Sequence, residues 1–555
     1  MAHPRDHEAA LSAPGAPFAA VRDENGVLVY AEGPRTLPEF MEPTWAFGDR
    51  PFLIGESASY TYRAFFTASC ALARRIHEEY GMARGERAAI VMRNHPEWQV
   101  AFWAVQLAGL VAVPLNTWWT EEELTYALDD CAPGLLLVDG GLLPSVDAWR
   151  RRTGARAVVF QGSEEQRGAG IERYEEFPAP DPLIAPPGVE VRPEDDATII
   201  YTSGTTGRPK GAVATQLAQA GSARHLQFYA AAALLAQGRV PGQGPSPVTL
   251  MTFPFFHVAA FASLYPTMAG GGALVLMRKW DADAALDLIV RHGVTGYAGV
   301  PTTALRLLDA AERRGGGLET VVHLGTGGAP PPPGLVRRIT AGHGDRIMPR
   351  NGYGLTETSG GVLTAYGEEY RRDPGSVGRP VPACEVRIAG PDGAELPEGA
   401  VGELWLRGQS LVRGYWRDER ATAAAFRDGW FRTGDLAVVR EGRVSVVDRL
   451  KDMVLRGGEN VYCAEVEAVL HDHPEVEDAA VLGVPHPELG EEVAAVVQLR
   501  AGAAVGAAEL RAYAGGRLAA FKVPAHVVLG AVPRNPTGKV LKRELRRELF
   551  GGHPG

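Results

Sequence analysis

The sequence predicts an α/β protein that is built from more than one domain. Between Arg50 and Asp139, apolar segments with strand spacing alternate with helical segments, which is typical of a layered α/β domain. From Ser376 onward, short strand-like segments are separated by Gly, Pro and Asp turns, which predicts a β-rich subdomain at about 376–448. A charged stretch from Arg449 to Gly458 precedes a shorter βα pattern. A chain of 555 residues is also too long for one hydrophobic core.

Individual elements follow the same pattern along the chain. Ala88 to Met92, Val111 to Leu115 and Leu135 to Val138 are apolar segments of strand length, and Glu97 to Leu107 has the length of a helix. Residues 1–20 are rich in Ala, Pro and His and predict a disordered leader. We therefore expect a large domain over residues 21–448 and a C-terminal domain over residues 453–555.

Composition excludes several classes of function. A formal net charge of −10 and a pI of 5.8 argue against a nucleic-acid-binding surface. The four cysteines are far apart and form no CxxC pair, so we expect no zinc site, no disulfide framework and a reducing, cytoplasmic location. The first ten residues predict no signal peptide, and no apolar stretch reaches the roughly 18 residues of a membrane span.

Lysine is rare in this chain. Only six lysines occur among the 56 basic residues, so the other fifty are Arg. In such a chain, lysines are expected to be enriched where a compact ammonium group is required. We interpret Lys279 and Lys542 as lysines that are present by chance, without a role that requires an ammonium group.

The chain is organised around a loop rich in glycine and hydroxyl groups. A short buried strand, Thr198 to Tyr201, leads into Thr202 to Gly211, where glycines let backbone N–H groups converge on an anion. Lys210 adds a full positive charge. The order of residues differs from that of a Walker A loop, and a Ser/Thr/Gly cluster alone is often only a surface loop. The expected phosphate-binding residues are Thr202, Ser203, Gly204, Thr205, Thr206, Gly207 and Lys210.

The amino-acid sequence of this loop, TSGTTGRPKGAV, resembles that of the phosphate loop of the adenylate-forming superfamily. This superfamily includes acyl-CoA synthetases, the adenylation domains of peptide synthetases and beetle luciferases. Two further segments resemble its motifs in the same order, RNGYGLTET at Arg350 to Thr358 and PRNPTGKVLKR at Pro533 to Arg543. The resemblance extends over roughly Pro38 to Leu549.

The second segment carries groups suited to a nucleotide and a metal. Tyr353 could stack on a purine, Thr356 could donate to a phosphate, and Glu357 could hold Mg²⁺. The resemblance implies that Tyr353 contacts adenine, Thr356 the α-phosphate and Glu357 the metal. It also implies an adenine- and ribose-binding set of Gly327, Gly328, Ala329, Pro330, Asn351, Gly352, Tyr353, Asp435 and Arg449.

Two further positions are assigned through the same resemblance. Asp435, in WFRTGD, could accept both ribose hydroxyls, although the string alone also fits a turn at a strand end. Arg449 is implied to bind ribose, and Lys451 is implied to be the pivot of a hinge at 449–452. Lys539, in a tight Pro/Gly turn, is implied to be the catalytic lysine. Its removal would reduce the rate about 10²- to 10³-fold.

The remaining candidates concern the acid and the thiol. Phe256 and His257 are implied to form the entrance to the acyl pocket, although a lone His among aromatic residues is more often a packed core residue. Gly457 and Gly458 are implied to line the channel for CoA. The sequence departs from the family at two positions, with Gln216 where many relatives have His and Cys463 where Pro is common.

The resemblance implies a large N-terminal AMP-binding domain, a hinge and a small mobile α+β domain. The leading hypothesis is an acyl-CoA synthetase that uses ATP, Mg²⁺ and CoA to activate a fatty or other apolar carboxylic acid. One alternative is transfer of the acyl group to the thiol of a separate carrier protein. A second alternative is a catalytically idle nucleotide-binding protein, and the sequence is also compatible with a homodimer.

Overall fold

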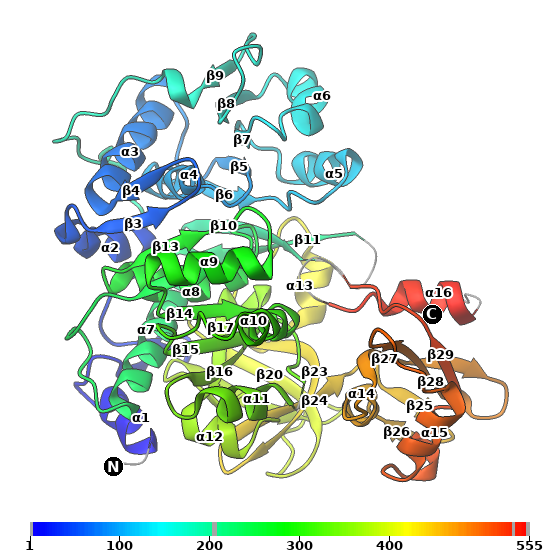
Figure 1. Cartoon of the computed structure of the whole chain (residues 1–555). Helices are drawn as coiled ribbons and strands as arrows, with labels where there is room; N and C mark the ends of the chain where they lie inside the picture. The colour runs from blue at the N-terminus through cyan, green and yellow to red at the C-terminus, as the bar shows by residue number, and fades with distance from the viewer. Residues whose placement is uncertain (1–3, 203–207, 333, 535–538, 551–555) are drawn as a thin grey trace.

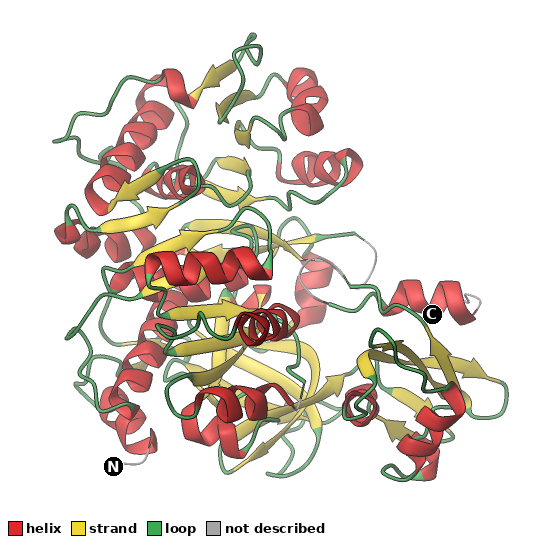
Figure 2. Cartoon of the chain, in the orientation of Figure 1, coloured by secondary structure: helices red, strands yellow, loops and turns green. Residues whose placement is uncertain are grey.

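The protein consists of a large α/β body and a smaller C-terminal domain (Figure 1). The structure is a computed structural model that describes residues 4–202, 208–332, 334–534 and 539–550. Helices pack on the sheets of the large body and lie between them (Figure 2). The predicted mixed α/β class, with a large N-terminal and a smaller C-terminal domain, is confirmed.

The first sheet of the large body carries, near one edge, the two strands that flank the predicted phosphate loop. Its strand order is β21-β11-β10-β6-β5-β7-β8-β9. The strands β5, β6, β7 and β8 are parallel and almost wholly apolar, as expected for strands covered by helices on both faces. The strands are β5 (Arg87–Val91), β6 (Val111–Pro114), β7 (Leu135–Asp139), β8 (Arg156–Phe160), β9 (Ile171–Arg173), β10 (Asp196–Thr202), β11 (Lys210–Thr215) and β21 (Gly414–Tyr415).

The second sheet has the order β18-β17-β16-β15-β14-β12-β13-β3-β4. Its central strands β12 to β16 run parallel, so their carboxyl ends meet at one edge. Ligands of open α/β sheets bind at that edge. The strands are β3 (Pro51–Ile54), β4 (Ser59–Thr61), β12 (Val248–Met251), β13 (Ala273–Leu276), β14 (Gly296–Gly299), β15 (His323–Gly327), β16 (Met348–Leu355), β17 (Gly360–Tyr366) and β18 (Arg379–Pro380).

Helix α4 (Pro96–Leu107) lies in the core that joins the two sheets. All of its residues are buried, and a helix that is apolar all round belongs in the interior. Trp98 stacks on Phe102 and on Phe255, with ring centroids 5.4 Å and 4.9 Å apart. The other helices of the large body are α2 (Leu37–Met41), α3 (Tyr62–Arg74), α5 (Glu121–Cys131), α6 (Pro144–Thr153), α7 (Gln216–Ala236), α8 (Phe261–Ala269), α9 (Ala282–His292), α10 (Pro301–Arg314), α11 (Gly334–His343), α12 (Gly367–Arg372) and α13 (Glu419–Ala425).

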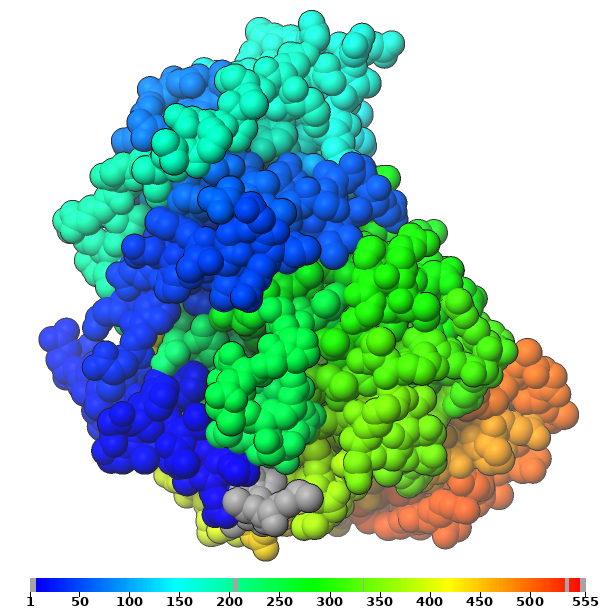
Figure 3. Space-filling view, turned by 60° about the vertical axis from the view of Figure 1, so that its left-hand side comes forward, coloured from blue at the N-terminus to red at the C-terminus, as the bar shows by residue number. Residues whose placement is uncertain are grey.

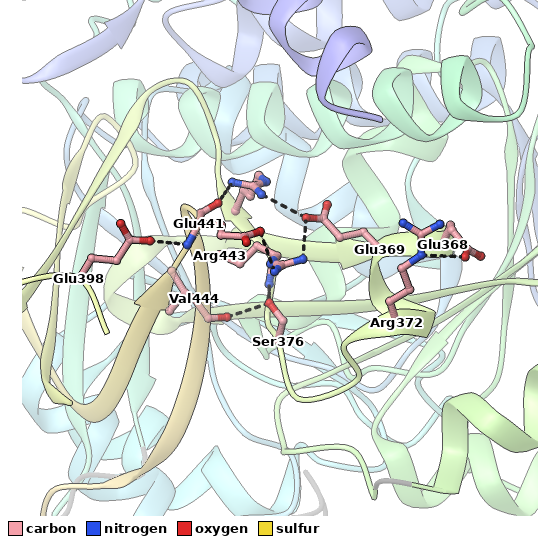
Figure 4. Close-up of polar contacts among 10 residues, drawn as sticks. Glu368, Glu369, Arg372, Ser376, Glu398, Glu441, Arg443 and Val444 are labelled. Atoms are coloured by element: carbon pink, nitrogen blue, oxygen red, sulfur yellow. Dashed lines mark hydrogen bonds and ion pairs between the residues drawn. The ribbon is translucent and has the colours of Figure 1, made fainter. Parts of the chain in front are cut away.

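A third, antiparallel sheet forms the β-rich part that follows the second sheet. A cluster of charges fastens its β23–β24 hairpin to α12 (Figure 4). Arg443 lies 3.7 Å from Glu369 and 3.2 Å from Glu441, and Ser376 donates to the Val444 carbonyl at 3.0 Å. Solvent-accessible ion pairs each contribute about 1 kcal/mol or less, so the cluster acts through several partly buried contacts together. The strands are β19 (Cys384–Ala389), β20 (Gly402–Gly408), β22 (Phe426–Arg427), β23 (Trp430–Arg440) and β24 (Arg443–Arg449).

The C-terminal domain has hydrophobic clusters of its own, around Val481 and around Leu482. Its sheet has the order β26-β25-β28-β27, with β29 paired to β28. Lys542 has a structural role, contrary to our interpretation that it is present by chance, because its Nζ lies 2.9 Å from Glu467 Oε1 in a largely buried ion pair. The elements are β25 (Val454–Arg456), β26 (Glu459–Val461), α14 (Cys463–His471), β27 (Val476–His486), β28 (Gly490–Leu499), α15 (Ala507–Gly515), β29 (His526–Leu529) and α16 (Lys542–Phe550).

The expectation of a disordered leader over residues 1–20 is wrong for the part that the structure describes. Residues Pro4–Ser12 form helix α1, and the hairpin of β1 (Ala20–Arg22) and β2 (Leu28–Tyr30) follows. Phe18 is buried against Phe228 of α7, with ring centroids 5.6 Å apart. The blue N-terminal segment accordingly lies against the main body (Figure 3). None of the helices in the described ranges has the length and apolar character needed to cross a membrane.

The cysteines give a test of this packing. All four are buried and unpaired, and burial raises the pKa of Cys70, Cys131 and Cys384 to about 12 and that of Cys463 as well. Because the thiolate is the reactive form, we expect the native protein to react negligibly with Ellman's reagent. In denaturant, all four thiols should react, which releases four equivalents of thionitrobenzoate per chain. Rapid labelling of one thiol in the native protein would contradict this arrangement.

Candidate active site

The ends of the predicted phosphate loop are held by two paired strands. Thr202 at the end of β10 pairs with Lys210 at the start of β11, so both lie at the base of the loop. Ser203, Gly204, Thr205, Thr206 and Gly207 lie outside the described residues. Arg208 packs over the ring of Tyr126 at 5.2 Å, and Tyr126 donates to the Pro209 carbonyl at 3.4 Å.

Glu357 lies in a single 3₁₀ turn, Thr356–Thr358, that follows strand β16. The turn ends at Ser359, whose φ of 53° is left-handed, and Gly360 continues the reversal into β17. The carboxylate of Glu357 accepts a hydrogen bond from the hydroxyl of Tyr415, with 2.7 Å between the oxygens. Tyr415 also places its ring 5.3 Å from Lys210 Nζ, so one side chain contacts both the lysine of the predicted phosphate loop and the predicted metal carboxylate.

The predicted adenine-binding residues gather where the carboxyl end of β15 meets the middle of β16. Gly327 pairs with Gly352 across these parallel strands. A Cβ at Gly327 would lie 3.2 Å from the Gly352 carbonyl oxygen, so the two backbones pack closely without side chains between them. Asn351 is buried in β16, next to Gly352. Gly328, Ala329 and Pro330 continue directly from β15.

Asp435 joins this region to the β-rich sheet. Its carboxylate, only 5% exposed, accepts a hydrogen bond from the Tyr353 hydroxyl at 2.6 Å. Arg449, its partner in the β23–β24 register, places Nε 3.2 Å from the other carboxylate oxygen. Burial and the charge of Asp435 raise the pKa of Tyr353 well above its usual value, so the hydroxyl remains a donor. The predicted adenine and ribose residues therefore form one connected group.

Lys539 reaches this group from the small domain. The red chain that precedes α16 runs toward the large domain near α13 (Figure 1). Burial lowers the pKa of Lys539, as do the charges of Arg449 and Lys451, whereas Glu357 and Asp435 raise it. Lys539 thus lies within electrostatic range of both predicted site carboxylates.

His257 lies within electrostatic range of Lys539. Burial and the charge of Lys539 lower the pKa of His257 to about 4, so the imidazole is neutral near pH 7. Its Nδ1 accepts the Ala259 N–H at 3.1 Å, which assigns the remaining ring proton to Nε2. Phe256 is buried against Trp118, with ring centroids 5.0 Å apart in an edge-to-face contact.

Two predicted residues are not brought to the site by any described contact. Gly457 and Gly458 form the exposed turn between β25 and β26, with φ angles of 61° and 91°. The Gly457 N–H donates to the Leu489 carbonyl within the small domain at 2.8 Å. The described hydrogen bond of Gly457 therefore stays within the small domain.

The two departures from the family pattern have structural explanations. Gln216 is buried at the start of α7, where it accepts the Leu37 N–H at 2.9 Å and donates to Gln106 at 2.8 Å. Cys463 begins α14, and its thiol donates to the Asp452 carbonyl at 3.0 Å. Both side chains hold local structure.

Tyr415 is the site residue that the sequence pattern does not reveal. It belongs to a two-residue strand in a Gly-Tyr-Trp string that fits any strand-to-turn segment. Its acceptor, Glu357, lies 58 residues earlier in the chain, so no local spacing could indicate the contact.

Comparison with known proteins agrees with this geometry. The family model for AMP-binding enzymes matches residues 43–416, which is more than half of the chain. The model for the C-terminal domain of AMP-binding enzymes matches residues 465–539. The match thus includes both the phosphate loop and Lys539.

Curated relatives cover most of the chain. The feruloyl-CoA synthase of an Amycolatopsis species is 36% identical over 84% of this chain and 90% of its own length. The long-chain-fatty-acid–CoA ligase FadD13 of Mycobacterium tuberculosis is 34% identical over 85% and 90%, respectively. The crystal structure of ATP-bound MatB from Rhodopseudomonas palustris has a TM-score of 0.78, at 30% identity over 91% of this chain and 98% of that one. The chain therefore belongs to the AMP-binding enzyme family, as an acid–thiol ligase of the adenylate-forming superfamily.

Proposed function

We propose that the protein joins an apolar carboxylic acid to CoA by way of an acyl-adenylate. The observation that carries this proposal is the position of Lys539. A lysine from the small domain lies within electrostatic range of Glu357, Asp435 and Arg449, which belong to the large domain. A site that binds nucleotide only for regulation has no evident need for a buried lysine supplied by a separate domain.

The charges around Lys539 suit a polyphosphate. The cations Lys210, Arg449 and Lys539 lie with the carboxylates Glu357 and Asp435, both of which already accept a tyrosine hydroxyl. ATP would bring the negative charge that balances the cations, and binding would raise the pKa of Lys539 toward its ordinary value. We assign the phosphates to the loop that Thr202 and Lys210 flank. Adenine is assigned to the strand ends at Gly327 to Pro330 and Asn351 to Tyr353.

Glu357 fits a magnesium ion. Mg²⁺ prefers oxygen ligands and is usually held by one or two carboxylates together with substrate phosphates and water. Glu357 has one carboxylate oxygen fixed by Tyr415, which leaves the other for a metal. A bound Mg²⁺ would neutralise phosphate charge and polarise the phosphoryl oxygens.

In the first half-reaction a carboxylate oxygen of the acid attacks the α-phosphorus of ATP. The bond from that phosphorus to the bridging oxygen breaks, and pyrophosphate leaves with the electron pair. Negative charge on the α-phosphoryl oxygens is stabilised by Lys539 and by the hydroxyl of Thr356. Asp435 and Arg449 hold the ribose, which keeps the α-phosphorus in place during the attack.

In the second half-reaction the sulfur of CoA attacks the acyl carbon, and the bond from that carbon to the AMP oxygen breaks. AMP leaves with the electron pair, and the thiol proton passes to solvent. Gly457 and Gly458 form an exposed turn whose described hydrogen bond stays within the small domain, and we propose that this domain turns about Lys451, within 449–452, to bring the turn to the site. Glycine suits a wall along which a narrow thiol arm passes close to the backbone.

The acid is proposed to be apolar. Phe256 and Trp118 form an aromatic edge next to His257, and the neutral ring of His257 can donate one hydrogen bond through Nε2. One relative takes its name from an aryl acid, feruloyl, and another from long-chain fatty acids, so both classes belong in a substrate panel. The four unpaired cysteines suit a reducing cytoplasm, where ATP and CoA are available.

Pyrophosphate release with MgATP and a panel of aryl and fatty acids tests the proposal. We expect release that depends on a particular acid, with AMP and an acyl-CoA formed only when CoA is added. Lys539→Ala should slow adenylation about 10²- to 10³-fold, whereas Lys279→Ala, at an exposed position outside the site, should not. Acid-dependent pyrophosphate release without acyl-CoA would favour a carrier-protein thiol. ATP binding with no turnover on any acid would favour an idle nucleotide-binding protein.

The lowered pKa of Lys539 predicts a pH dependence. A lysine with a lowered pKa loses its charge at a lower pH than usual, so kcat/KM for MgATP should fall as pH rises through that pKa. The basic limb of kcat should lie at higher pH, because bound phosphates raise the pKa of Lys539. In Lys539→Arg, whose guanidinium stays protonated, the basic limb of the kcat/KM profile should move to higher pH. An unchanged limb in that variant would assign the ionisation to another group.

A further inference from the structure

A short segment of the β-rich part, residues 412–416, connects the two halves of the site. We call it the bridging segment. Through β21 it extends the first sheet, pairing Tyr415 with Ala212 and Gly414 with Val213 of β11. Backbone hydrogen bonds from Arg413 to Val213 at 2.9 Å and from Trp416 to Gly211 at 2.7 Å continue this pairing. The bridging segment therefore fixes the strand that leaves the phosphate loop.

The same segment holds the turn that carries Glu357. The Val412 N–H donates to the Glu357 carbonyl at 2.9 Å, which fixes the backbone of the turn. The Tyr415 hydroxyl donates to Glu357 Oε1 at 2.7 Å, which fixes the carboxylate. Glu357 is therefore anchored twice by the segment that also sets the register of β11.

Tyr415 also contacts the cation of the phosphate loop. Lys210 Nζ lies 5.3 Å from the centroid of the tyrosine ring, within the range of a cation–π interaction. A carboxylate accepts and a tyrosine hydroxyl can donate, so Tyr415 is the donor in its bond to Glu357. One side chain thus contacts a cation through its ring and a carboxylate through its hydroxyl.

We propose that Tyr415 is a positioning residue that fixes the metal carboxylate of Glu357 relative to Lys210. This inference rests on the proposed function and assigns a residue that the family resemblance did not supply. With Oε1 taken by the hydroxyl, Oε2 would be the oxygen that holds Mg²⁺, while the ring of the same side chain contacts Lys210. Without the hydroxyl, Glu357 would be free to turn toward Lys210, and the phosphate loop and the metal would lose their fixed spacing.

Tyr415→Phe tests the role of the hydroxyl alone. The ring, its contact with Lys210 and the backbone bond from Tyr415 to Thr422 remain in this variant. A suitable control is Tyr366→Phe, because Tyr366, which is none of the residues assigned to the site, donates to the carboxylate of Glu8 at the same distance of 2.7 Å. Both variants lose one hydroxyl-to-carboxylate bond, so we expect similar shifts of the unfolding midpoint.

The expected difference lies in the use of magnesium. A hydrogen bond to a charged group is worth enough that Tyr415→Phe should raise the half-saturating Mg²⁺ concentration or lower kcat by about 10- to 100-fold. The KM for the acid should stay unchanged, as should every constant of Tyr366→Phe. In a protein that already carries Glu357→Gln, which removes the charged acceptor, Tyr415→Phe should change the half-saturating Mg²⁺ concentration and kcat by less than about threefold.

Three results would overturn the proposal. They are an unchanged Mg²⁺ dependence in Tyr415→Phe, equal losses in Tyr415→Phe and Tyr366→Phe, and full additivity with Glu357→Gln. If the wild-type protein turns over no acid, the proposed function fails, but the role of Tyr415 stays testable by calorimetric titration with ATP. Tyr415→Phe should then weaken binding in the presence of Mg²⁺ much more than binding in its absence, and equal weakening in both conditions would refute the role.

Discussion

The arrangement of the site follows from one electrostatic constraint, the gathering of several cations in a partly buried place. Lys210, Arg449 and Lys539 lie near the carboxylates of Glu357 and Asp435, and burial and the neighbouring cations lower the pKa of Lys539. Like charges at such a place repel one another unless an anion is supplied. The two carboxylates are each held by a tyrosine hydroxyl, Glu357 by Tyr415 at 2.7 Å and Asp435 by Tyr353 at 2.6 Å. These hydrogen bonds fix both carboxylates, and Asp435 in addition pairs with Arg449 Nε at 3.2 Å, so the charges have defined positions before the proposed polyphosphate binds.

This constraint explains why the site lies where separate parts of the chain meet. The phosphate loop leaves the first sheet, Glu357 follows the second sheet, Asp435 belongs to the β-rich sheet, and Lys539 comes from the small domain. Each part has its own rigid scaffold, so the spacing between charges depends on the contacts that join the parts. The bridging segment at 412–416 is such a contact, because it is at once a strand of the first sheet and an anchor of Glu357.

The sequence predicts the elements and motifs much better than the contacts that join them. Apolar strands such as β5 and β7, and the strings that contain Glu357 and Lys539, are local patterns. The sequence does not indicate the contact of Tyr415, because its acceptor lies 58 residues away. It does not indicate the ordered N-terminal segment either, because Tyr366, the partner of Glu8, lies 358 residues away. Ala- and Pro-rich composition carries no information about a surface that can receive Phe18. The acid itself is beyond prediction for another reason, since one methylene changes discrimination by only about 1–3 kcal/mol.

The proposed turning of the small domain has consequences at the hinge itself. Asp448, at the end of β24, accepts the N–H of Cys463, the first residue of α14, across the segment 449–452. Burial raises the pKa of Asp448 to about 6, and the nearby charge of Lys542 opposes this rise. A rotation about Lys451 must either carry Asp448 with the small domain or break its bond to α14 and expose the carboxylate. Breaking this bond would return the Asp448 carboxylate to water, and its hydration would offset part of the free energy lost with the hydrogen bond. The hinge therefore contains a contact whose two states need not differ greatly in free energy, which is what the proposed turning of the small domain requires.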